Sequence, residues 1–268
     1  MQRFTNRVVI VTGASAGIGL ATARAFAAEG AQLVLAARNP DRLQSAAAAL
    51  TAHGSTAVLA VPCDITNRAD VDHLIACAVQ RFGRIDILVN NAGCGILGPF
   101  GTAPIADAIA LFETNFFGTL HCCQAVLPQM KQQKSGHIVT LSSLAGLHGV
   151  PNAIYSASKA AVIALSDSLR LETAHAGIRV TVLCPGRVRL SDTAFFDVAK
   201  RYGPVQLTRA PSDLTADEVA RVLLNAVHRR KRLVVFPGYA RLLWILDKFS
   251  PQLVDHILSR HLPRPITD

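Results

Sequence analysis

The sequence predicts a single α/β domain built on a doubly wound parallel sheet of about seven strands, with helices on both faces and a helical extension at the carboxyl end. Short, β-branched apolar segments alternate along the chain with longer segments in which apolar residues recur every three or four positions. The short segments are apolar throughout, as strands are when a parallel sheet is covered on both faces. Regular strand–helix alternation favours right-handed crossovers, which wind a sheet in this way.

The elements are expected in alternating order along most of the chain. The expected strands are Arg7–Thr12, Gln32–Ala37, Thr56–Val61, Asp86–Val89, His137–Leu141 and Arg179–Leu183. The expected helices are Ile18–Glu29, Asp41–Ala52, Arg68–Arg81, Ile105–Lys131 and Ala157–Ala176. No linker or internal repeat interrupts them, so residues 1–268 are expected to form one domain. The pattern lapses from Val188 to Ser212, and residues 187–213 are expected to form a substrate loop, because a loop this long in a compact domain is typically functional.

The last part of the chain is expected to complete the sheet and then leave it. Asp217–Arg229 has a helical pattern, and the apolar run Leu233–Phe236 is expected to be the final strand. Residues 239–262 are expected to form an amphipathic helical tail, because Tyr239–Phe249 combines apolar residues with basic ones. Two interpretations of the tail stay open. It packs on its own domain or on a subunit partner, or, together with the basic cluster His228–Arg232, it makes peripheral contact with a membrane.

The composition excludes several classes of protein. With 50% hydrophobic and 17% charged residues, the chain is not expected to be disordered or of low complexity. Its six cysteines show neither metal-ligand spacing nor a disulfide framework, so we expect no metal and a reducing, cytoplasmic location. No signal peptide and no run long enough to span a membrane are apparent. Most of the net charge of +9 lies in a tail without a nucleic-acid motif, so no nucleic-acid partner is expected.

A glycine-rich turn, Gly13-Ala14-Ser15-Ala16-Gly17-Ile18-Gly19, follows the first expected strand directly. A strand, such a turn and a helix place backbone N–H groups where the pyrophosphate of a dinucleotide binds. Gly13 allows the tight turn, Gly17 allows close approach of the backbone, and Gly19 lets the helix pack on the sheet. The alternative is a turn of purely structural importance.

The end of the second expected strand indicates which dinucleotide is bound. Where an acidic residue would bind the adenosine ribose hydroxyls, this chain has Ala37 followed by Arg38. The guanidinium of Arg38 suits a 2′-phosphate, so the sequence favours NADP(H) over NAD(H). The alternative is that Arg38 is an ordinary solvated loop residue.

Tyr155 and Lys159 are spaced four residues apart, which places them on one face of a helix. An ammonium group near the phenol is expected to lower the tyrosine pKa from its reference value of ~10 and to favour acid–base chemistry. The pair alone is common on helix surfaces. Two further polar motifs accompany it, Asn90-Asn91-Ala92-Gly93 after the fourth expected strand and Ser142-Ser143 after the fifth.

Together these motifs resemble those of the short-chain dehydrogenase/reductase family, in the branch whose turn reads TGxxxGxG, from about Arg7 to Gly186. The resemblance implies a Rossmann-like fold, a homodimer or homotetramer, and hydride transfer between a nicotinamide and a carbonyl or secondary alcohol carbon. It also implies four catalytic residues. Tyr155 would exchange a proton with the substrate oxygen, and Lys159 would bind the nicotinamide ribose. Ser143 would polarise the carbonyl, and Asn115 would anchor a water relay behind Lys159.

The resemblance and the glycine-rich turn also imply the set of residues that would contact the cofactor. Asp64 would lie against the adenine, Asn91 would support the sheet beside the cofactor, and Pro185 and Gly186 would border the nicotinamide. The full set is Gly13, Ser15, Gly17, Ile18, Gly19, Arg38, Asp64, Ile65, Asn91, Ala92, Gly93, Tyr155, Lys159, Pro185, Gly186 and Val188.

The chain departs from the family pattern at two places. The usual spacing to the tyrosine indicates Ser142, whereas the residues around the strand end indicate Ser143, which we favour. The family often has a threonine near position 190 that hydrogen-bonds the nicotinamide carboxamide. This chain has Leu190 there, with Ser191 and Thr193 as substitutes.

The residues expected around the substrate are apolar: Ile96, Leu97, Phe100, Leu147, Val150, Phe195 and Phe196. They favour a small hydrophobic carbonyl or alcohol of the steroid, retinoid or long-chain type, although they also suit an ordinary core. His148 is expected at the rim of this pocket rather than in catalysis. The alternative functions are a catalytically silent NADP(H)-binding sensor or scaffold and, less in keeping with the length of the chain, an epimerase or dehydratase.

Overall fold

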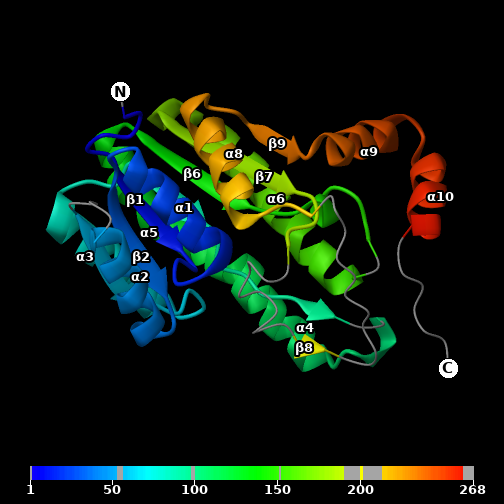
Figure 1. Cartoon of the computed structure of the whole chain (residues 1–268), viewed down its shortest axis with the longest axis horizontal. Coiled ribbons are helices and arrows are strands. Elements are labelled where there is room, and N and C mark those ends of the chain that lie inside the picture. The colour runs from blue at the N-terminus through cyan, green and yellow to red at the C-terminus, as the bar shows by residue number, and fades with distance from the viewer. Residues whose placement is uncertain are drawn as a thin grey trace.

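Seven parallel strands form the central sheet of the computed structural model, in the order β3-β2-β1-β4-β6-β7-β9 (Figure 1). The structure describes residues 2–52, 57–97, 100–150, 152–189, 200–201 and 213–261. The strands are β1 (Val8–Thr12), β2 (Gln32–Ala37), β3 (Val58–Pro62), β4 (Ile87–Asn90), β6 (Gly136–Leu141), β7 (Ile178–Pro185) and β9 (Leu233–Phe236). The predicted doubly wound sheet is confirmed. A separate short parallel pair joins β5 (Ile96–Leu97) to β8 (Lys200–Arg201).

Helices cover both faces of the sheet, and each face has its own apolar core (Figure 1). On one face lie α1 (Gly17–Ala28), α2 (Pro40–Ala52) and α8 (Ala216–His228), and on the other lie α3 (Arg68–Phe82), α5 (Gly118–Gln133) and α6 (Ala153–Thr173). Alternate residues of one strand enter the two cores, as in β1, where Val9 and Val11 face the first core and Val8 and Ile10 the second. This explains why the strands are apolar throughout.

The helix expected at Ile105–Lys131 is interrupted, which corrects the prediction. α4 (Ile105–Phe112) passes into one π-helical turn (Glu113–Phe117) before α5 begins. The wider turn brings Asn115 into the interior and lays Gly118 against Ile65, where a Cβ atom would collide with the isoleucine side chain. A single inserted residue of this kind hardly alters the apolar periodicity, so the pattern did not reveal it.

The helix that carries Tyr155 and Lys159 also begins earlier than expected. α6 starts at Ala153 rather than at Ala157, so Tyr155 lies in its first turn. A 3₁₀ turn (Ala174–Ala176) follows the end of α6 and leads to β7. Tyr155 and Lys159 therefore lie on the same helix, about one turn apart, as predicted.

The ends of the expected substrate loop are joined at their base. Arg187 Nε lies 2.8 Å from Asp213 Oδ1, and the Leu214 N–H donates to the Arg187 carbonyl over 2.9 Å. Residues 190–199 and 202–212, which include Phe195 and Phe196, lie outside the described residues. The ion pair therefore fixes the segment that leaves β7 beside the start of α8.

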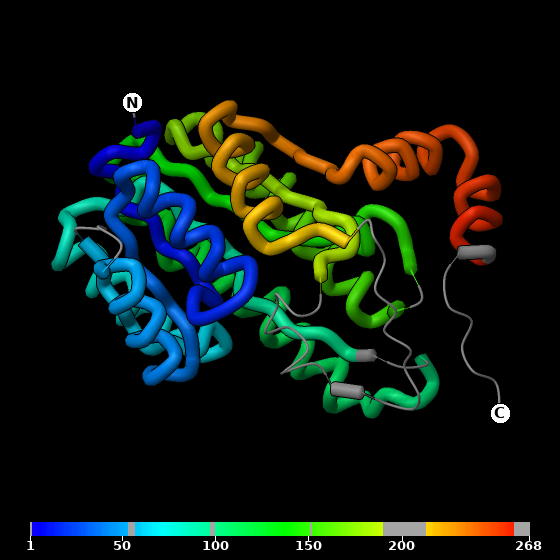
Figure 2. Tube along the Cα trace, viewed as in Figure 1, coloured from blue at the N-terminus to red at the C-terminus, as the bar shows by residue number. Residues whose placement is uncertain are grey.

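The expected tail consists of two helices, α9 (Gly238–Phe249) and α10 (Pro251–His261), separated at Ser250. Pro251 cannot donate the backbone hydrogen bond that would continue α9. Figure 2 shows the two helices reaching beyond the end of β9, away from the helices of the amino-terminal half. In the described residues no helix is both long enough and apolar enough to cross a membrane.

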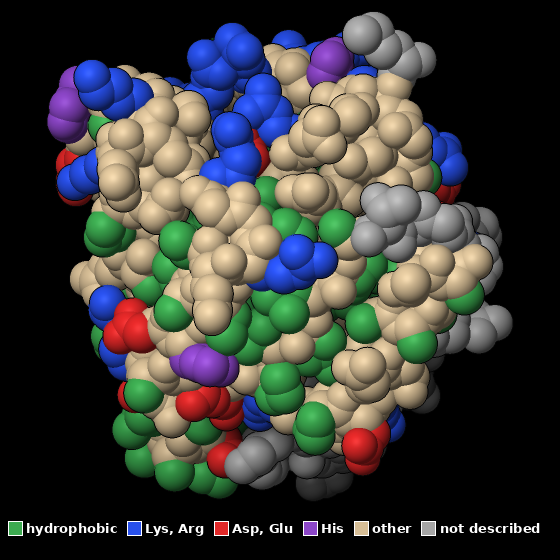
Figure 3. Space-filling model, turned by 90° about the vertical axis from the view of Figure 1, so that its left-hand side faces the viewer, with side chains coloured by type: hydrophobic (Ala, Val, Ile, Leu, Met, Phe, Trp, Pro, Cys, Tyr) green, Lys and Arg blue, Asp and Glu red, His purple; other side chains and the backbone are tan. Residues whose placement is uncertain are grey.

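Basic residues stand at the amino-terminal ends of several strands. Arg7, Arg84, Lys134 and Arg232 each precede a strand by one to three residues. Figure 3, which views the molecule from the side of α2 and α3, shows Lys and Arg side chains gathered along its upper edge. Part of this charge is balanced by Asp86, which accepts hydrogen bonds from Arg7 and Arg84. The basic cluster before β9 is separated from α9 by the length of that strand.

Candidate active site

A cavity of about 880 Å³ opens at the carboxyl ends of the strands. It includes the ends of β1 and β4, between which the strand order reverses, and ligands of doubly wound sheets bind at this crevice. The structure brings together almost all of the predicted site residues on its walls. These are Gly13, Ser15, Gly17, Ile18, Arg38, Asp64, Ile65, Asn91, Ala92, Gly93, Ser143, Tyr155, Lys159, Pro185, Gly186 and Val188.

The glycine-rich turn has the backbone geometry that the sequence predicts. Gly13 and Gly17 have positive φ angles of 66° and 55°. A Cβ atom at Gly19 would collide with the Gly13 carbonyl oxygen, so Gly19 supports the turn from outside the cavity. Asn91 holds the same turn, since its Nδ2 donates to the Thr12 carbonyl over 2.8 Å and to the Gly13 carbonyl over 3.3 Å.

The N-terminus of α1 suits an anionic ligand. Ala16 at the N-cap position has no side-chain acceptor, and the first turn contains no acidic residue. The first amide groups of the helix are therefore not satisfied by a side-chain cap, and the positive end of the helix dipole lies at the cavity. The residues present fit the pyrophosphate of a dinucleotide.

Two cations stand where the cavity passes the ends of β2 and β3. Arg38 and Arg42 both line it and are exposed, and no side-chain partner of Arg38 is found in the described ranges. Asp64 lines the same end, with its Oδ1 accepting from the Thr66 amide over 3.0 Å and the Thr66 hydroxyl over 2.9 Å. Sequence reasoning missed Arg42, although a second arginine four residues after Arg38 was a signal for it.

The two adjacent serines have different surroundings. Ser143 hydrogen-bonds the side chain of Tyr155. The hydroxyl of Ser142 donates instead to the carbonyl oxygen of Lys159 over 2.8 Å, which ties the end of β6 to α6. The structure therefore places Ser143, rather than Ser142, beside the tyrosine.

Tyr155 and Lys159 lie close together at the inner end of the cavity. Lys159 Nζ is 5.7 Å from the centroid of the Tyr155 ring and donates to the Leu141 carbonyl over 3.1 Å. Burial raises the pKa of Tyr155 to about 12, against an opposing hydrogen bond from Ser143. Burial also lowers the pKa of Lys159 to about 8. The expected lowering of the tyrosine pKa by Lys159 is thus not found, because desolvation of the buried phenol raises that pKa.

Asn115 is buried just behind the cavity rather than on its wall. Its Oδ1 accepts from the Cys94 amide over 2.9 Å, and its Nδ2 donates to the Cys94 carbonyl and to Ser158 Oγ, both over 3.0 Å. These bonds clamp the segment after Gly93 against α6. The water relay expected at Asn115 stays a prediction.

The apolar end of the cavity differs from the expected set. Val150 lines it, but Phe100 is 73% exposed and Ile96 and Leu147 pack elsewhere. The side chain of Leu97, like Phe195 and Phe196, lies outside the described residues. Sequence reasoning missed the apolar residues that do line this end, which are Leu144, Ala145, Tyr239, Leu243 and Leu258. The last three lie on α9 and α10, and no local pattern indicates that these helices pack beside the cavity.

His148 connects the loop before α6 to the carboxyl-terminal helices. Its Nδ1 lies 2.8 Å from Asp247 Oδ1, and its Nε2 lies 3.8 Å from Asp255 Oδ1. The side chain therefore faces α9 and α10, and His148 is not among the residues that line the cavity.

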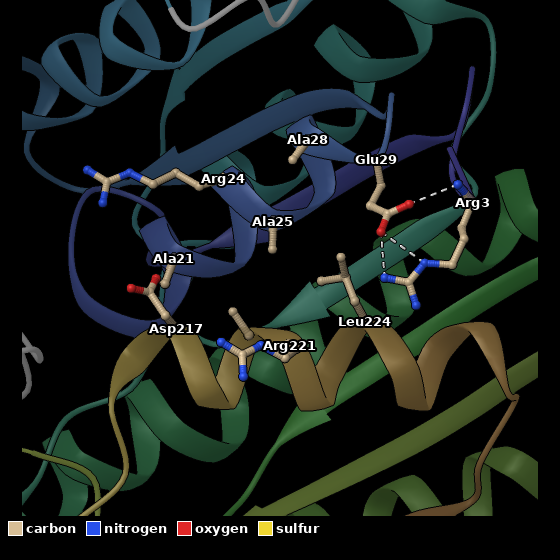
Figure 4. Close-up of a pocket in the computed structure, with 10 residues that line it drawn as sticks. Arg3, Ala21, Arg24, Ala25, Ala28, Glu29, Asp217, Arg221 and Leu224 are labelled. Carbon is tan, nitrogen blue, oxygen red and sulfur yellow. Dashed lines mark hydrogen bonds and ion pairs between the residues drawn. The ribbon is translucent and has the colours of Figure 1, made fainter. Parts of the chain in front are cut away.

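A second, shallower hollow of about 360 Å³ lies between α1 and α8 (Figure 4). Its floor is largely alanine, and its edge carries the ion pair of Arg3 with Glu29, whose Nη2 and Oε1 are 2.6 Å apart. Figure 4 shows Arg24 directed away from this pair. The hollow has no serine, cysteine, lysine or histidine among its lining residues. In the part of the chain that the structure describes, no three potential ligands gather to hold a metal ion.

Comparison with known proteins gives the same family over most of the chain. A family model described as short chain dehydrogenase matches residues 7–198. An uncharacterized oxidoreductase of Staphylococcus aureus (strain USA300) is 36% identical over 236 residues, which are 88% of this chain and 96% of that protein.

Two solved structures are similar in fold. A short chain dehydrogenase/reductase from Burkholderia phymatum in complex with NAD is 29% identical, covers 100% of both chains and has a TM-score of 0.83. A metagenomic short-chain oxidoreductase in complex with NADP is also 29% identical, covers 87% of this chain and 98% of that one, and has a TM-score of 0.72. The chain belongs to the short-chain dehydrogenase/reductase family and is an NAD(P)-dependent oxidoreductase.

Proposed function

We propose that the protein uses NADP(H) to interconvert a carbonyl group and a secondary alcohol on a small hydrophobic substrate. One observation carries the proposal: a single cavity joins the glycine-rich turn and Arg38 at one end to Ser143, Tyr155 and Lys159 at the other. A dinucleotide laid across these walls would place its two halves on opposite sides of the point where the strand order reverses.

Each catalytic side chain has a distinct role in this proposal. When bound, the nicotinamide supplies or accepts the hydride. Ser143 hydrogen-bonds the substrate oxygen, and the Tyr155 hydroxyl donates a proton to it during reduction and accepts one during oxidation. Lys159 binds the cofactor ribose, and its ammonium stabilises negative charge that develops on the phenol. Asn115 positions the backbone beside Lys159 through Cys94.

The proposal is tested by following NADPH and NADH oxidation with a panel of hydrophobic ketones and aldehydes and small polar counterparts. NADPH-dependent turnover of the hydrophobic compounds is the expected result. The main alternative is a silent NADP(H)-binding sensor or scaffold. Tight NADPH binding without hydride transfer to any member of a broad panel would favour that alternative.

Arg38 is expected to determine the preference for NADP(H), because it is an exposed cation on the cavity wall. The Arg38→Ala variant should lower the NADPH/NADH ratio of kcat/KM about 10- to 100-fold, as for loss of a charge-assisted hydrogen bond. The Arg24→Ala variant is the matched control, since Arg24 is an exposed arginine on α1. If the wild type, Arg38→Ala and Arg24→Ala have the same NADPH/NADH ratio of kcat/KM, Arg38 does not bind the 2′-phosphate.

The apolar wall supports a hydrophobic substrate of the steroid, retinoid or long-chain type. Leu144, Val150, Leu243 and Leu258 line the end that holds Tyr155. Apolar walls with few polar groups favour ligands of the same character.

The cytoplasmic location expected from the cysteines stays a prediction.

The outer face of α9 is proposed to contact an anionic membrane surface. Leu242, Ile245 and Phe249 recur at helical spacing and are 58%, 38% and 85% exposed. Arg241 and Lys248 are exposed beside this stripe, as in helices that lie in the headgroup region. The stripe belongs to the same helix as Leu243, so the contact would bring a lipid-dissolved substrate close to the cavity.

The Phe249→Asp variant should reduce flotation with phosphatidylcholine vesicles that contain phosphatidylglycerol, because it places a negative charge in the stripe. The Leu171→Asp variant is the control, since Leu171 is an exposed leucine on α6. If Phe249→Asp changes the molar mass of the protein in solution and does not reduce its flotation, the stripe is instead a contact between copies of the chain.

We also propose a homodimer or homotetramer, for which exposed Ile105 and Ile109 on α4 offer a further apolar surface.

A further inference from the structure

We propose that Tyr239 is a second functional phenol of the active site and that its hydroxyl hydrogen-bonds the carboxamide of the nicotinamide. The inference rests on the proposed function, because it concerns the cofactor of that reaction. Tyr239 lies in the first turn of α9, more than eighty residues after Tyr155 in the sequence, and it lines the same cavity.

The end of the sheet fixes where Tyr239 lies. β9 pairs with β7 so that Phe236 stands opposite Pro185, and the Gly186 N–H donates to the Phe236 carbonyl over 2.7 Å. α9 begins two residues after Phe236, directly beside Gly186. A methyl group at Gly186 would come within 2.8 Å of the Tyr239 Oη atom. The phenol therefore reaches over the Gly186 backbone.

The same geometry shows that Gly186 belongs to the reactive end of the cavity. Leu141 and Leu183 are partners in the β6–β7 ladder, and the Ser142 N–H donates to the Leu183 carbonyl over 2.8 Å. The segments that follow these two strands, which carry Ser143 and Gly186, therefore lie side by side. Hydride transfer requires the nicotinamide next to the group that exchanges the proton, here Tyr155. Tyr155 and the Gly186 segment would therefore hold the nicotinamide ring between them.

The chemistry of Tyr239 suits a carboxamide. A carboxamide offers an acceptor oxygen and a donor NH₂ group, and a phenol hydroxyl both donates and accepts. No hydrogen-bond partner of the Tyr239 hydroxyl is found in the ranges that the structure describes. At position 190 the chain has leucine, whose side chain cannot form a hydrogen bond. Tyr239 supplies a polar group at the nicotinamide end from a different part of the chain.

The Tyr239→Phe variant tests this role because it removes only the hydroxyl. The dissociation constants of NADPH and of 2′-phospho-ADP-ribose, which lacks the nicotinamide, are measured by calorimetry on the full-length protein. Loss of one hydrogen bond should raise the Kd of NADPH about fivefold. The Kd of 2′-phospho-ADP-ribose should not change. The Leu242→Ala variant, on the exposed face of the same helix, should leave both values unchanged.

Two results would overturn the proposal for Tyr239. An unchanged Kd for NADPH would show that the hydroxyl does not contact the nicotinamide, and a raised substrate KM in the same variant would then assign Tyr239 to the substrate. Equal weakening of both ligands would indicate a general disturbance of the cavity. If wild-type protein binds neither ligand, the proposed function itself fails, which is a different outcome from a failure of Tyr239 alone.

Discussion

Replacing Tyr155 with phenylalanine is expected to lower kcat for carbonyl reduction by about 100- to 10,000-fold, the usual contribution of general acid–base catalysis. The substitution removes the only atom of this side chain that can pass a proton to the substrate oxygen. The ring remains in the first turn of α6, so the neighbouring walls are retained. Turnover is followed as NADPH oxidation with the best substrate of the panel, and NADPH affinity is measured separately.

The two measurements distinguish chemistry from folding. NADPH affinity in Tyr155→Phe should stay close to that of the wild type, because the glycine-rich turn and Arg38 hold the distant half of the cofactor. Wild-type turnover in the variant would remove Tyr155 from the mechanism. A loss of NADPH binding would show that the side chain maintains the shape of the cavity instead.

Replacing Asp86 with alanine is expected to lower the free energy of unfolding by about 2 to 3 kcal/mol, the cost of breaking a buried hydrogen-bond network. The carboxylate is only 5% exposed and accepts hydrogen bonds from Arg7, from Arg84 and, over 3.0 Å, from the Val8 amide. It therefore joins the start of β1 to the segment before β4. Urea denaturation of the two proteins measures the difference.

Asp72→Ala is the control, because its ion pair with Arg68 joins two half-exposed side chains one helical turn apart. Such pairs contribute under about 1 kcal/mol. If both variants lose the same stability, burial of the Asp86 network is not what stabilises this edge of the sheet.

The contribution of Asp86 is also expected to depend on pH. Burial by itself would raise the pKa of this carboxyl, but hydrogen bonds from Arg84, the Val8 amide and Arg7 hold it below its usual range. A group with a lowered pKa in the folded state stabilises above its unfolded pKa of ~3.9 and loses that contribution as the pH falls through the folded value. The difference between wild type and Asp86→Ala should therefore shrink only in acid.

Local patterns in the sequence were sufficient to predict the sheet and most of the helices. The strand Leu233–Phe236 was predicted with its observed bounds, and the glycine-rich turn was placed at the start of α1. Both depend on neighbouring residues alone, through β-branched runs and the glycines at a turn. The π-helical turn at Glu113–Phe117 was not predictable in this way, because Asn115 enters the interior to bond a residue twenty-one positions earlier.

The candidate site was predictable as far as it depends on motifs. Tyr155, Lys159 and the glycines lie in short patterns, and the structure gathers them in one cavity. Spacing along the chain indicated Ser142, whereas the residues at the strand end favoured Ser143, and Ser143 is the serine that hydrogen-bonds Tyr155. The prediction of a lowered tyrosine pKa was wrong, because desolvation depends on all the residues packed around the phenol. The apolar wall from α9 and α10 depends on where β9 ends in space.

The position of that wall in the chain has an evolutionary consequence. Every predicted catalytic residue lies between Asn115 and Lys159, and the predicted cofactor contacts end at Val188. Leu243 and Leu258, which line the apolar end from α9 and α10, come last, beyond Tyr239. Recombination downstream of that residue can exchange this part of the pocket lining while the predicted hydride-transfer residues are inherited intact. A protein whose segments follow this order can acquire new substrates when the residues after Tyr239 in α9 and α10 are exchanged.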